Sequence, residues 1–365
     1  MKYRMIQVGT GGWGGAWCGS FIPPNIKDGL VEVVAAVDTN PEALKNAQQH
    51  LGIRADQCYT DIGKAFDENK ADFCTVVVPP AFHESVVDMA LNHDMHILSE
   101  KPISDTLENS IRIANKVKNA GKKMGVTMSH RFRQDITTLR EEIRSGKYGD
   151  LDYLICRFTC ECRTYGAWGK FRYEIPDPLM IEGAVHHLDL LADMAANSSS
   201  GSYGGKCKTI YAQTWQPSWG KFSGDAQALV IMGLDNGSRS FYEGAKTNAV
   251  GLNCWGAEYI RAECEKATFI LSYGKIEGFN YDPTHERANR KEGTGKDVPL
   301  LQQLKWANTW LIEKFVRWLD GGEIMETNVE DNLQSVALIF AAIESNKTGQ
   351  PIQVQDFLSN TRSNL

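Results

Sequence analysis

The sequence lacks the features that would place a protein in a membrane, on nucleic acid or in a secretory route. No apolar run among its 365 residues approaches the roughly 20 residues that cross a bilayer, and the N-terminus has no apolar core of a signal peptide. The formal net charge is −6, so the basic excess of a general nucleic-acid binder is absent. These absences predict a cytoplasmic protein without a membrane or nucleic-acid partner.

The cysteines lack the order of a disulfide framework or a metal site. Nine cysteines, an odd number, are scattered along the chain. Cys156, Cys160 and Cys162 lie close in sequence, but their spacing matches no zinc motif, and on a strand they would share one face. We therefore predict reduced, mostly buried thiols and no bound metal.

The strongest local pattern present is MIQVGTGGWG, from Met5 to Gly14. Its apolar run breaks into Gly9-x-Gly11-x-x-Gly14, which predicts a buried strand, a tight turn and a helix beginning near Trp13. The first glycine allows the turn, the second lets backbone approach a pyrophosphate, and the third lets helix and strand pack closely. The N–H groups of the helix N-terminus then face the phosphates. Because glycine-rich turns are common, the pattern alone is weak support for a dinucleotide site.

Apolar runs alternate with helical segments through residue 128. Strands are predicted at Leu30–Val37, Phe73–Val78, Met95–Ser99 and Met124–Met128, and helices from Trp13 to about Phe21, at Pro41–Leu51 and at Ser104–Ala120. The first helix is predicted to end before Pro23-Pro24. This alternation predicts a parallel, doubly wound sheet, in which ligands bind at the carboxyl ends of the strands.

Asp38 follows the second predicted strand, close to where a dinucleotide-binding pattern places an acidic residue. A carboxylate there can accept both ribose hydroxyls of NAD, and it would repel the 2′-phosphate of NADP. The same side chain can instead cap the helix that begins near Pro41. The two roles can coexist.

Beyond about residue 150 the pattern changes to strict alternation. Long antiparallel strands are predicted at Leu151–Arg163, Thr209–Trp215, Ala226–Gly233 and Ser238–Gly244, with polar loops at Asn197–Gly205 and Thr284–Asp297. Asp235-Asn236-Gly237 is typical of a hairpin turn. A last helix is predicted from Thr327, with Glu330 completing a capping box, to Gly349. The second half therefore forms a separate, mostly antiparallel sheet.

Two groups of residues could carry chemistry. Lys101 ends a predicted strand of the first sheet, where a partly desolvated ammonium can hold a substrate hydroxyl, although a surface lysine is an equal interpretation. Glu182 and His186 are four residues apart, on one face of a predicted helix. A histidine oriented by a carboxylate is the usual base for a hydroxyl proton. The alternative is a helix whose polar residues satisfy one another at a domain junction.

Taken together, these stretches resemble the Gfo/Idh/MocA family, named for glucose-fructose oxidoreductase and inositol dehydrogenase. The stretches are VGTGGWG, the strand end at Asp38, VVVPPAFH from Val76, Glu100-Lys101-Pro102, EGAVHHLDLL from Glu182, and the C-terminal helix. The resemblance covers essentially the whole chain. Glu182 stands where many members have aspartate, and Ala184 where glycine is common.

The resemblance implies an NAD-binding Rossmann domain over residues 1–128 and an α/β substrate-binding and oligomerisation domain over residues 129–365. It also allows the C-terminal helices to pack back on the first domain. It implies that Lys101, His186 and Glu182 are catalytic. The implied cofactor-binding residues are Gly9, Gly11, Gly12, Trp13, Gly14, Asp38, Pro79, His83, Glu100 and Lys101. The implied substrate-binding residues are Lys101, Arg131, Trp168 and His187.

The function implied is NAD-dependent hydride transfer, with NADP possible, to or from a secondary hydroxyl or ketone of a sugar or cyclitol. A homodimer or homotetramer through the C-terminal sheet is also implied. Two alternatives remain open at this point: an NAD-dependent glycoside hydrolase that oxidises its substrate transiently, and a non-catalytic NAD-binding sensor.

Overall fold

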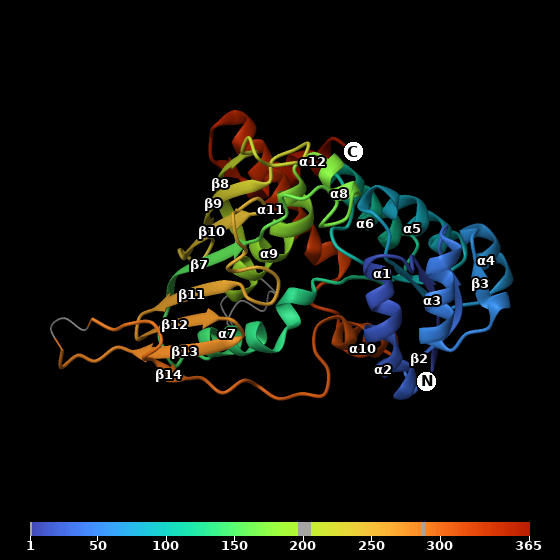
Figure 1. Ribbon diagram of the computed structural model, residues 1–365, viewed down its shortest axis with the longest axis horizontal. Coiled ribbons are helices and arrows are strands. Elements are labelled where there is room, and N and C mark those ends of the chain that lie inside the picture. The colour runs from blue at the N-terminus through green and yellow to red at the C-terminus, as the bar shows by residue number, and fades with distance from the viewer. Residues whose placement is uncertain (1, 196–205, 286–288) are drawn as a thin grey trace. The chain divides into compact units, whose positions relative to one another are not determined.

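The computed structural model describes residues 2–195, 206–285 and 289–365 (Figure 1). The predicted loop at Asn197–Gly205 lies outside the described residues. The chain forms two compact units, of which the first contains residues 1–132, 304–336 and 365, and the second residues 133–303 and 337–364. No helix of the described ranges is long and apolar enough to cross a membrane.

The first unit is built on a six-stranded sheet with the order β3-β2-β1-β4-β5-β6, and every neighbouring pair is parallel. Its strands are β1 (Tyr3–Val8), β2 (Val31–Val37), β3 (Cys58–Tyr59), β4 (Phe73–Val76), β5 (His96–Ser99) and β6 (Met124–Val126). These runs are almost wholly buried, as expected for a parallel sheet covered on both faces. The predicted doubly wound sheet is confirmed.

The helices that follow the strands are α1 (Trp13–Ala16), α2 (Ile22–Lys27), α3 (Pro41–Leu51), α4 (Ile62–Glu68), α5 (His83–Asn92) and α6 (Leu107–Asn119). A late segment, α10 (Ala307–Leu319), also belongs to this unit, where Phe315 packs edge-on against Phe73 of β4.

The predicted end of the first helix before the proline pair is wrong. A π-helical turn, η1 (Trp17–Phe21), follows α1, and α2 then contains Pro23 and Pro24 in its first turn. Proline is tolerated there because the first N–H groups of a helix need no partner within it. The helical segment therefore continues to Lys27.

The second unit contains a nine-stranded sheet with the order β14-β13-β12-β11-β7-β10-β9-β8-β15. Its strands are β7 (Leu151–Thr159), β8 (Cys207–Trp215), β9 (Gln227–Leu234), β10 (Arg239–Ala245), β11 (Tyr259–Cys264), β12 (Ala267–Ser272), β13 (Lys275–Asn280), β14 (Lys296–Asp297) and β15 (Ile352–Gln353). Gly237, at φ +89°, forms the predicted hairpin turn between β9 and β10. The sheet is mostly antiparallel, as predicted, but β7 and β10 pair in parallel.

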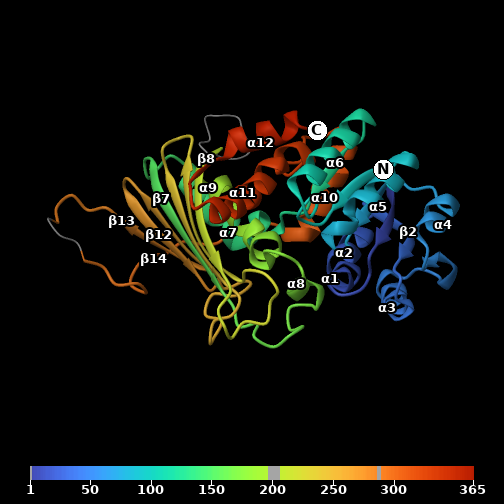
Figure 2. The same cartoon turned by 90° about the horizontal axis from the view of Figure 1, so that it is seen from above.

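Helices cover one face of this sheet (Figure 2). They include α7 (Gln134–Arg144), α9 (Val185–Met194) and α12 (Val354–Ser363), which contact β12, β7 and β8 respectively. The long helix α11 (Val329–Thr348) contributes its C-terminal half, where Ser345 Oγ accepts a hydrogen bond from Ala212 N at 3.1 Å. The opposite face is where Leu229, Ile231 and Phe241 lie exposed.

The prediction that the thiols are reduced is wrong at two positions. Cys160 and Cys254 form a disulfide, with their Cα atoms 4.9 Å apart and their positions 94 apart in sequence. The parallel pairing of β7 with β10 brings the end of β7 beside the loop that follows β10. No local spacing could indicate this pairing, because it depends on the strand order. Cys156 and Cys162 are free thiols.

Candidate active site and cofactor-binding turn

The Gly-rich turn (Gly9–Gly14) has a geometry that only glycine permits at two positions. A Cβ on Gly9, where φ is +86°, would lie 2.0 Å from the carbonyl oxygen of Val77. A Cβ on Gly14 would lie 2.3 Å from the carbonyl oxygen of Gly9. Strand β1, the turn and α1 are therefore packed backbone to backbone. Next to Gly12 there is open space, since a Cβ there would meet nothing within 4 Å.

Asp38 holds this turn from the end of β2. Its Oδ2 accepts hydrogen bonds from the backbone N–H groups of Thr10 at 2.7 Å and Gly11 at 2.8 Å. Its Oδ1 accepts from the N–H of Asn40 at 2.8 Å, and Asn40, rather than Asp38, caps α3 through the N–H of Glu42. The carboxylate thus joins the two segments between which a ribose would lie.

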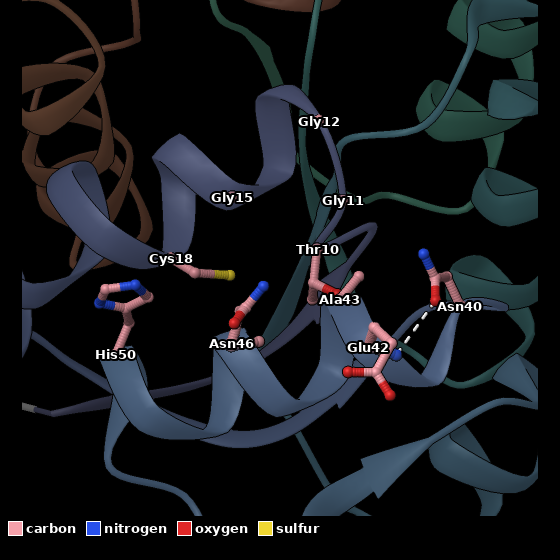
Figure 3. Close-up of a pocket in the computed structure, with 11 residues that line it drawn as sticks. Thr10, Gly11, Gly12, Gly15, Cys18, Asn40, Glu42, Ala43, Asn46 and His50 are labelled. Carbon is pink, nitrogen blue, oxygen red and sulfur yellow. Dashed lines mark hydrogen bonds between the residues drawn. The ribbon is translucent and has the colours of Figure 1, made fainter.

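A pocket of about 520 Å³ opens beside the turn (Figure 3). Its walls come from the Gly-rich turn and η1 on one side and from α3 on the other, and Asn46 and His50 line it toward the end of α3. Glu42 also lines the pocket, and Asp38 holds the turn that forms one of its walls. The glycine cradle, the helix N-terminus and these acidic groups fit the diphosphate and the unphosphorylated ribose of NAD.

Glu100 ties the cofactor-binding helix to the strand end that bears Lys101. Its buried Oε1 accepts hydrogen bonds from the indole N–H of Trp13 at 2.7 Å and of Trp17 at 2.8 Å. Its Oε2 accepts from the N–H of Lys101 at 3.3 Å. Sequence analysis missed Trp17, although its position four residues after Trp13 places both indoles on one helical face.

Pro79 lies between β4 and α5, and His83 is the first residue of α5. Pro79 precedes the short helical turn at residues 80–82, and the His83 ring is fully buried. Its Nε2 lies 2.9 Å from the carbonyl oxygen of Val78, and its Nδ1 lies 3.1 Å from that of Ile103. The ring links two strand ends, and its contact with a cofactor stays a prediction. Arg131 is largely buried in the turn at residues 129–132.

In the second unit, Glu182 and His186 lie where a π-helix becomes an α-helix. Glu182 is in η5 (Leu179–Ala184), and His186 is in the first turn of α9. The expected uninterrupted α-helix is therefore wrong, and π-helical turns are frequent at functional sites. The buried Glu182 Oε2 accepts an ion-paired hydrogen bond at 2.7 Å from Nε of Arg172, a partner that sequence analysis missed.

Aromatic and cationic side chains surround this helix start. Two cations lie over the Trp168 ring, with Lys246 Nζ 3.6 Å and the Arg172 guanidinium carbon 5.3 Å from its centroid. Lys246 is fully buried, and its Nζ also lies 4.4 Å from the Phe158 centroid. Such contacts stabilise a buried ammonium group. Nothing in the local sequence distinguished Lys246 from a surface lysine.

His187 is wholly buried against the sheet. Its Nδ1 lies 3.2 Å from the Tyr242 hydroxyl, and its Nε2 lies 3.7 Å from Glu258 Oε1. Burial lowers the pKa of His187, and Glu258 offsets this in part. A role for this residue in binding substrate stays a prediction, as does the catalytic role of His186.

Comparison with known proteins agrees with these features. Residues 4–128 match the family described as "Oxidoreductase family, NAD-binding Rossmann fold", and residues 140–354 match "Oxidoreductase family, C-terminal alpha/beta domain". The chain is 49% identical to an uncharacterised protein, y4oX, of Sinorhizobium fredii, over 99% of this chain and 98% of that protein. It is 23% identical to a D-apiose dehydrogenase of Rhizobium rhizogenes, over 88% and 90% of the two chains.

A solved structure with the same fold is the WlbA dehydrogenase of Bordetella pertussis, crystallised with NADH and UDP-GlcNAcA. It superposes with a TM-score of 0.77 at 20% identity and covers 97% of this chain and 99% of its own. The two matched domains together span most of the sequence. The chain therefore belongs to the Gfo/Idh/MocA family of oxidoreductases and carries that family's NAD-binding Rossmann domain.

Proposed function

We propose that the protein transfers hydride between NAD and a secondary hydroxyl or ketone of a sugar or cyclitol. The observation that carries the proposal is the pair of hydrogen bonds from Trp13 and Trp17 to Glu100. Through the Glu100 side chain they connect the backbone of Lys101 to the helix that begins at the Gly-rich turn. This connection supports the proposal that Lys101 lies beside a bound cofactor, where a dehydrogenase needs a group that holds the reacting oxygen.

When bound, NAD supplies a hydride acceptor at C4 of the nicotinamide. His186 takes the hydroxyl proton, since a neutral imidazole is a competent base near neutral pH. Lys101 donates a hydrogen bond to the same oxygen and stabilises the negative charge that develops as the proton leaves. Glu182, paired with Arg172, helps to fix the start of the helix that carries His186.

A sugar-like substrate is supported by the similarity to D-apiose dehydrogenase and by the aromatic side chains near His186. Indole rings present flat apolar faces that match the C–H face of a cyclic polyol. Trp168 lies among these rings. A screen of sugars and inositols with NAD and with NADP, followed by NADH absorbance, would identify the substrate.

The first prediction concerns the two proposed catalytic groups. We expect Lys101→Ala and His186→Ala each to lower kcat by a factor of roughly 100 to 10,000, because each removes a group that acts on the transferred proton or its oxygen. The affinity for NAD, measured by fluorescence titration, should change little in His186→Ala. Lys118→Ala and His285→Asn, at exposed positions, are matched controls that should retain activity.

Near-normal turnover in both variants would contradict the assignment. An NAD-dependent glycosidase would instead release free sugar without net accumulation of NADH. Binding of NAD without turnover of any tested polyol would favour a sensor.

A further inference from the structure

The loop between β10 and β11 (residues 246–258) is cross-linked to the end of β7. The Cys160–Cys254 disulfide makes the cross-link, and Trp255 is the next residue in the chain. Backbone hydrogen bonds add to it, since Asn253 N donates to Thr159 O at 3.3 Å and Thr159 N donates to Asn253 O at 3.2 Å. Trp255 lies in the turn that follows, which the Ala257 N–H closes by donating to Cys254 O at 2.8 Å.

Trp255 packs against both histidines of α9. Its ring centroid lies 5.9 Å from that of His186, with the rings nearly perpendicular at 85°. It lies 5.8 Å from that of His187, with the rings nearly parallel at 23°. It also lies 4.3 Å from the Phe158 centroid and 4.5 Å from Lys246 Nζ. We call Trp255, Phe158, His186, His187 and Lys246 the Trp255 cluster.

Trp255 is the exposed member of this cluster. Its side chain is 38% exposed, whereas Phe158, His187 and Lys246 are fully buried. A half-exposed indole on a loop loses conformational freedom when it packs in one orientation, and this loss opposes the packing. A cross-link at the adjacent residue reduces that cost, because the loop is already restricted before the ring packs.

We propose that Trp255 is a positioning residue for the His186–His187 pair, and that the Cys160–Cys254 disulfide holds it in place. Its ring, nearly perpendicular to that of His186, fixes the plane of the His186 ring, and its nearly parallel packing closes the stack over His187. The redox state of the disulfide thereby controls the orientation of the two histidine rings. The consequence for catalysis rests on the proposed function, but the effect on the histidine rings does not.

Reduction needs a dithiol as reductant. The dithiol gives up two electrons and two protons, the Sγ–Sγ bond breaks, and Cys160 and Cys254 each become a thiol. The reductant leaves as a cyclic disulfide. The Asn253–Thr159 and Ala257–Cys254 backbone bonds remain, so the sheet and the turn stay in place. The Trp255 indole loses only the restraint that the disulfide adds at the adjacent residue.

The test follows the ring signals of the eight histidines by NMR of ¹³C-histidine-labelled, full-length protein, with His186 and His187 assigned from His→Asn variants. We expect the ring signals of both residues to shift when the wild type is treated with dithiothreitol. Cys160→Ser/Cys254→Ser should show the shifted positions without reductant and should not respond to it. Cys264→Ser, which removes a free thiol of the same unit, should respond like the wild type.

Two substitutions of the indole separate positioning from folding. Trp255→Ala should shift both histidine signals and lower kcat roughly tenfold with little change in KM, since misplacing a catalytic group by a fraction of an ångström is costly. Trp255→Phe keeps an aromatic ring. It should return the histidine signals close to their wild-type positions and restore most of the lost kcat. If Trp255 only stabilised the fold, Trp255→Ala would lower the melting temperature, and Trp255→Phe would not return the histidine signals to their wild-type positions.

Thiol titration of the denatured, unreduced wild type should find seven thiols, and a count of nine would overturn the proposal. Unchanged histidine signals in both reduced wild type and Trp255→Ala would also overturn it. If the signals shift as expected but no polyol is oxidised by the wild type, the proposed function fails and the positioning by Trp255 stands.

Discussion

At the scale of single residues, three carboxylates among the candidate residues each contact two segments of their own unit. Asp38 accepts hydrogen bonds from the Gly-rich turn and from the segment before α3. Glu100 joins the first helix to the strand end that precedes Lys101. Glu182 pairs with Arg172, from a different helix. A carboxylate that joins two segments holds their backbone geometry and also supplies a negative charge. Its removal therefore loosens the backbone and changes the local charge.

Asp38 sets the second prediction. We expect Asp38→Ala to weaken NAD binding by a factor of roughly 10 to 100, because hydrogen bonds to a charged group contribute about 1.5–3 kcal/mol each. The substitution also loosens the turn, which weakens NADP binding as well. NADP should lose less affinity than NAD, because the carboxylate that repels its 2′-phosphate is removed. The ratio of the two dissociation constants, measured by titration, is therefore the informative quantity. Glu108→Ala, which removes an exposed carboxylate of the same unit outside the pocket, is the control, and an unchanged ratio in Asp38→Ala would refute the ribose role.

His187 sets the third prediction, which concerns pH. Burial holds its folded-state pKa below the ordinary value of 6.5, so the unfolded chain takes up a proton before the folded one does. Stability should be fully present above about pH 6.5 and should fall as pH decreases, by at most about 1.4 kcal/mol per pH unit from this residue. Urea unfolding at about pH 7.5 and about pH 5.5 measures this loss. In His187→Phe the loss of unfolding free energy between these two pH values should be smaller than in the wild type. An equal loss would contradict the contribution assigned to His187.

At the scale of elements, two irregular helices place the site residues. The segment from Trp13 to Lys27 passes through a π-helical turn, and Glu182 lies in another. The start of α11 also differs from the expected capping box of Thr327 and Glu330. Asn328 Oδ1 accepts from the N–H groups of Glu330 and Asp331, whereas the Thr327 hydroxyl donates to Val126 O at 2.6 Å. Thr327 therefore serves a contact with β6, and its neighbour caps the helix.

The fourth prediction compares adjacent glycines of α1. Gly14→Ala should lower the free energy of unfolding by about 1–3 kcal/mol and weaken NAD binding, because its Cβ would meet the carbonyl oxygen of Gly9. Gly15→Ala meets only ordinary contact distances, with Thr10 O at 3.6 Å. That substitution should leave stability unchanged or raise it by about 0.5–1 kcal/mol, since alanine favours a helix. Denaturant unfolding measures the free energy of unfolding of both variants. An equal loss in Gly14→Ala and Gly15→Ala would show that close packing at Gly14 is unimportant.

At the scale of the whole molecule, the open face of the second sheet presents a row of apolar side chains. Tyr211, Ile231, Phe241 and Ile155 are register partners across β8, β9, β10 and β7. Ile231 and Phe241 are 47% and 38% exposed, and Leu229 adds a further exposed side chain beside them. Contiguous apolar surface of this kind marks an interaction site. We propose that a second copy of the chain covers it.

The fifth prediction tests this face. We expect the wild type to sediment as an oligomer and Ile231→Glu as a monomer, because a carboxylate would be buried without a partner in the interface. Ile324→Glu introduces the same charge at an exposed isoleucine of the first unit and should sediment like the wild type. A wild type that sediments as a monomer at micromolar concentration would show that this face stays open.

Much of the first unit could be predicted from the sequence, because parallel buried strands are continuous apolar runs. The runs at β1, β2 and β4, the helix Pro41–Leu51 and the alternation between them indicated the doubly wound sheet. Local patterns also placed Gly9, Gly14, Asp38 and Lys101 at the carboxyl ends of strands. These predictions succeeded because strand burial and turn geometry depend on neighbours in sequence.

Only the tertiary structure showed which side chains meet. The Cys160–Cys254 disulfide, the packing of Trp255 on the histidines and the burial of Lys246 all depend on β7 lying beside β10. The indole hydrogen bonds to Glu100 likewise join residues more than 80 positions apart. The sequence by itself determined the family, the cofactor-binding sheet and the residue types available for chemistry. The tertiary structure decided their partners, because contacts between distant segments follow from strand order and packing, which no local pattern encodes.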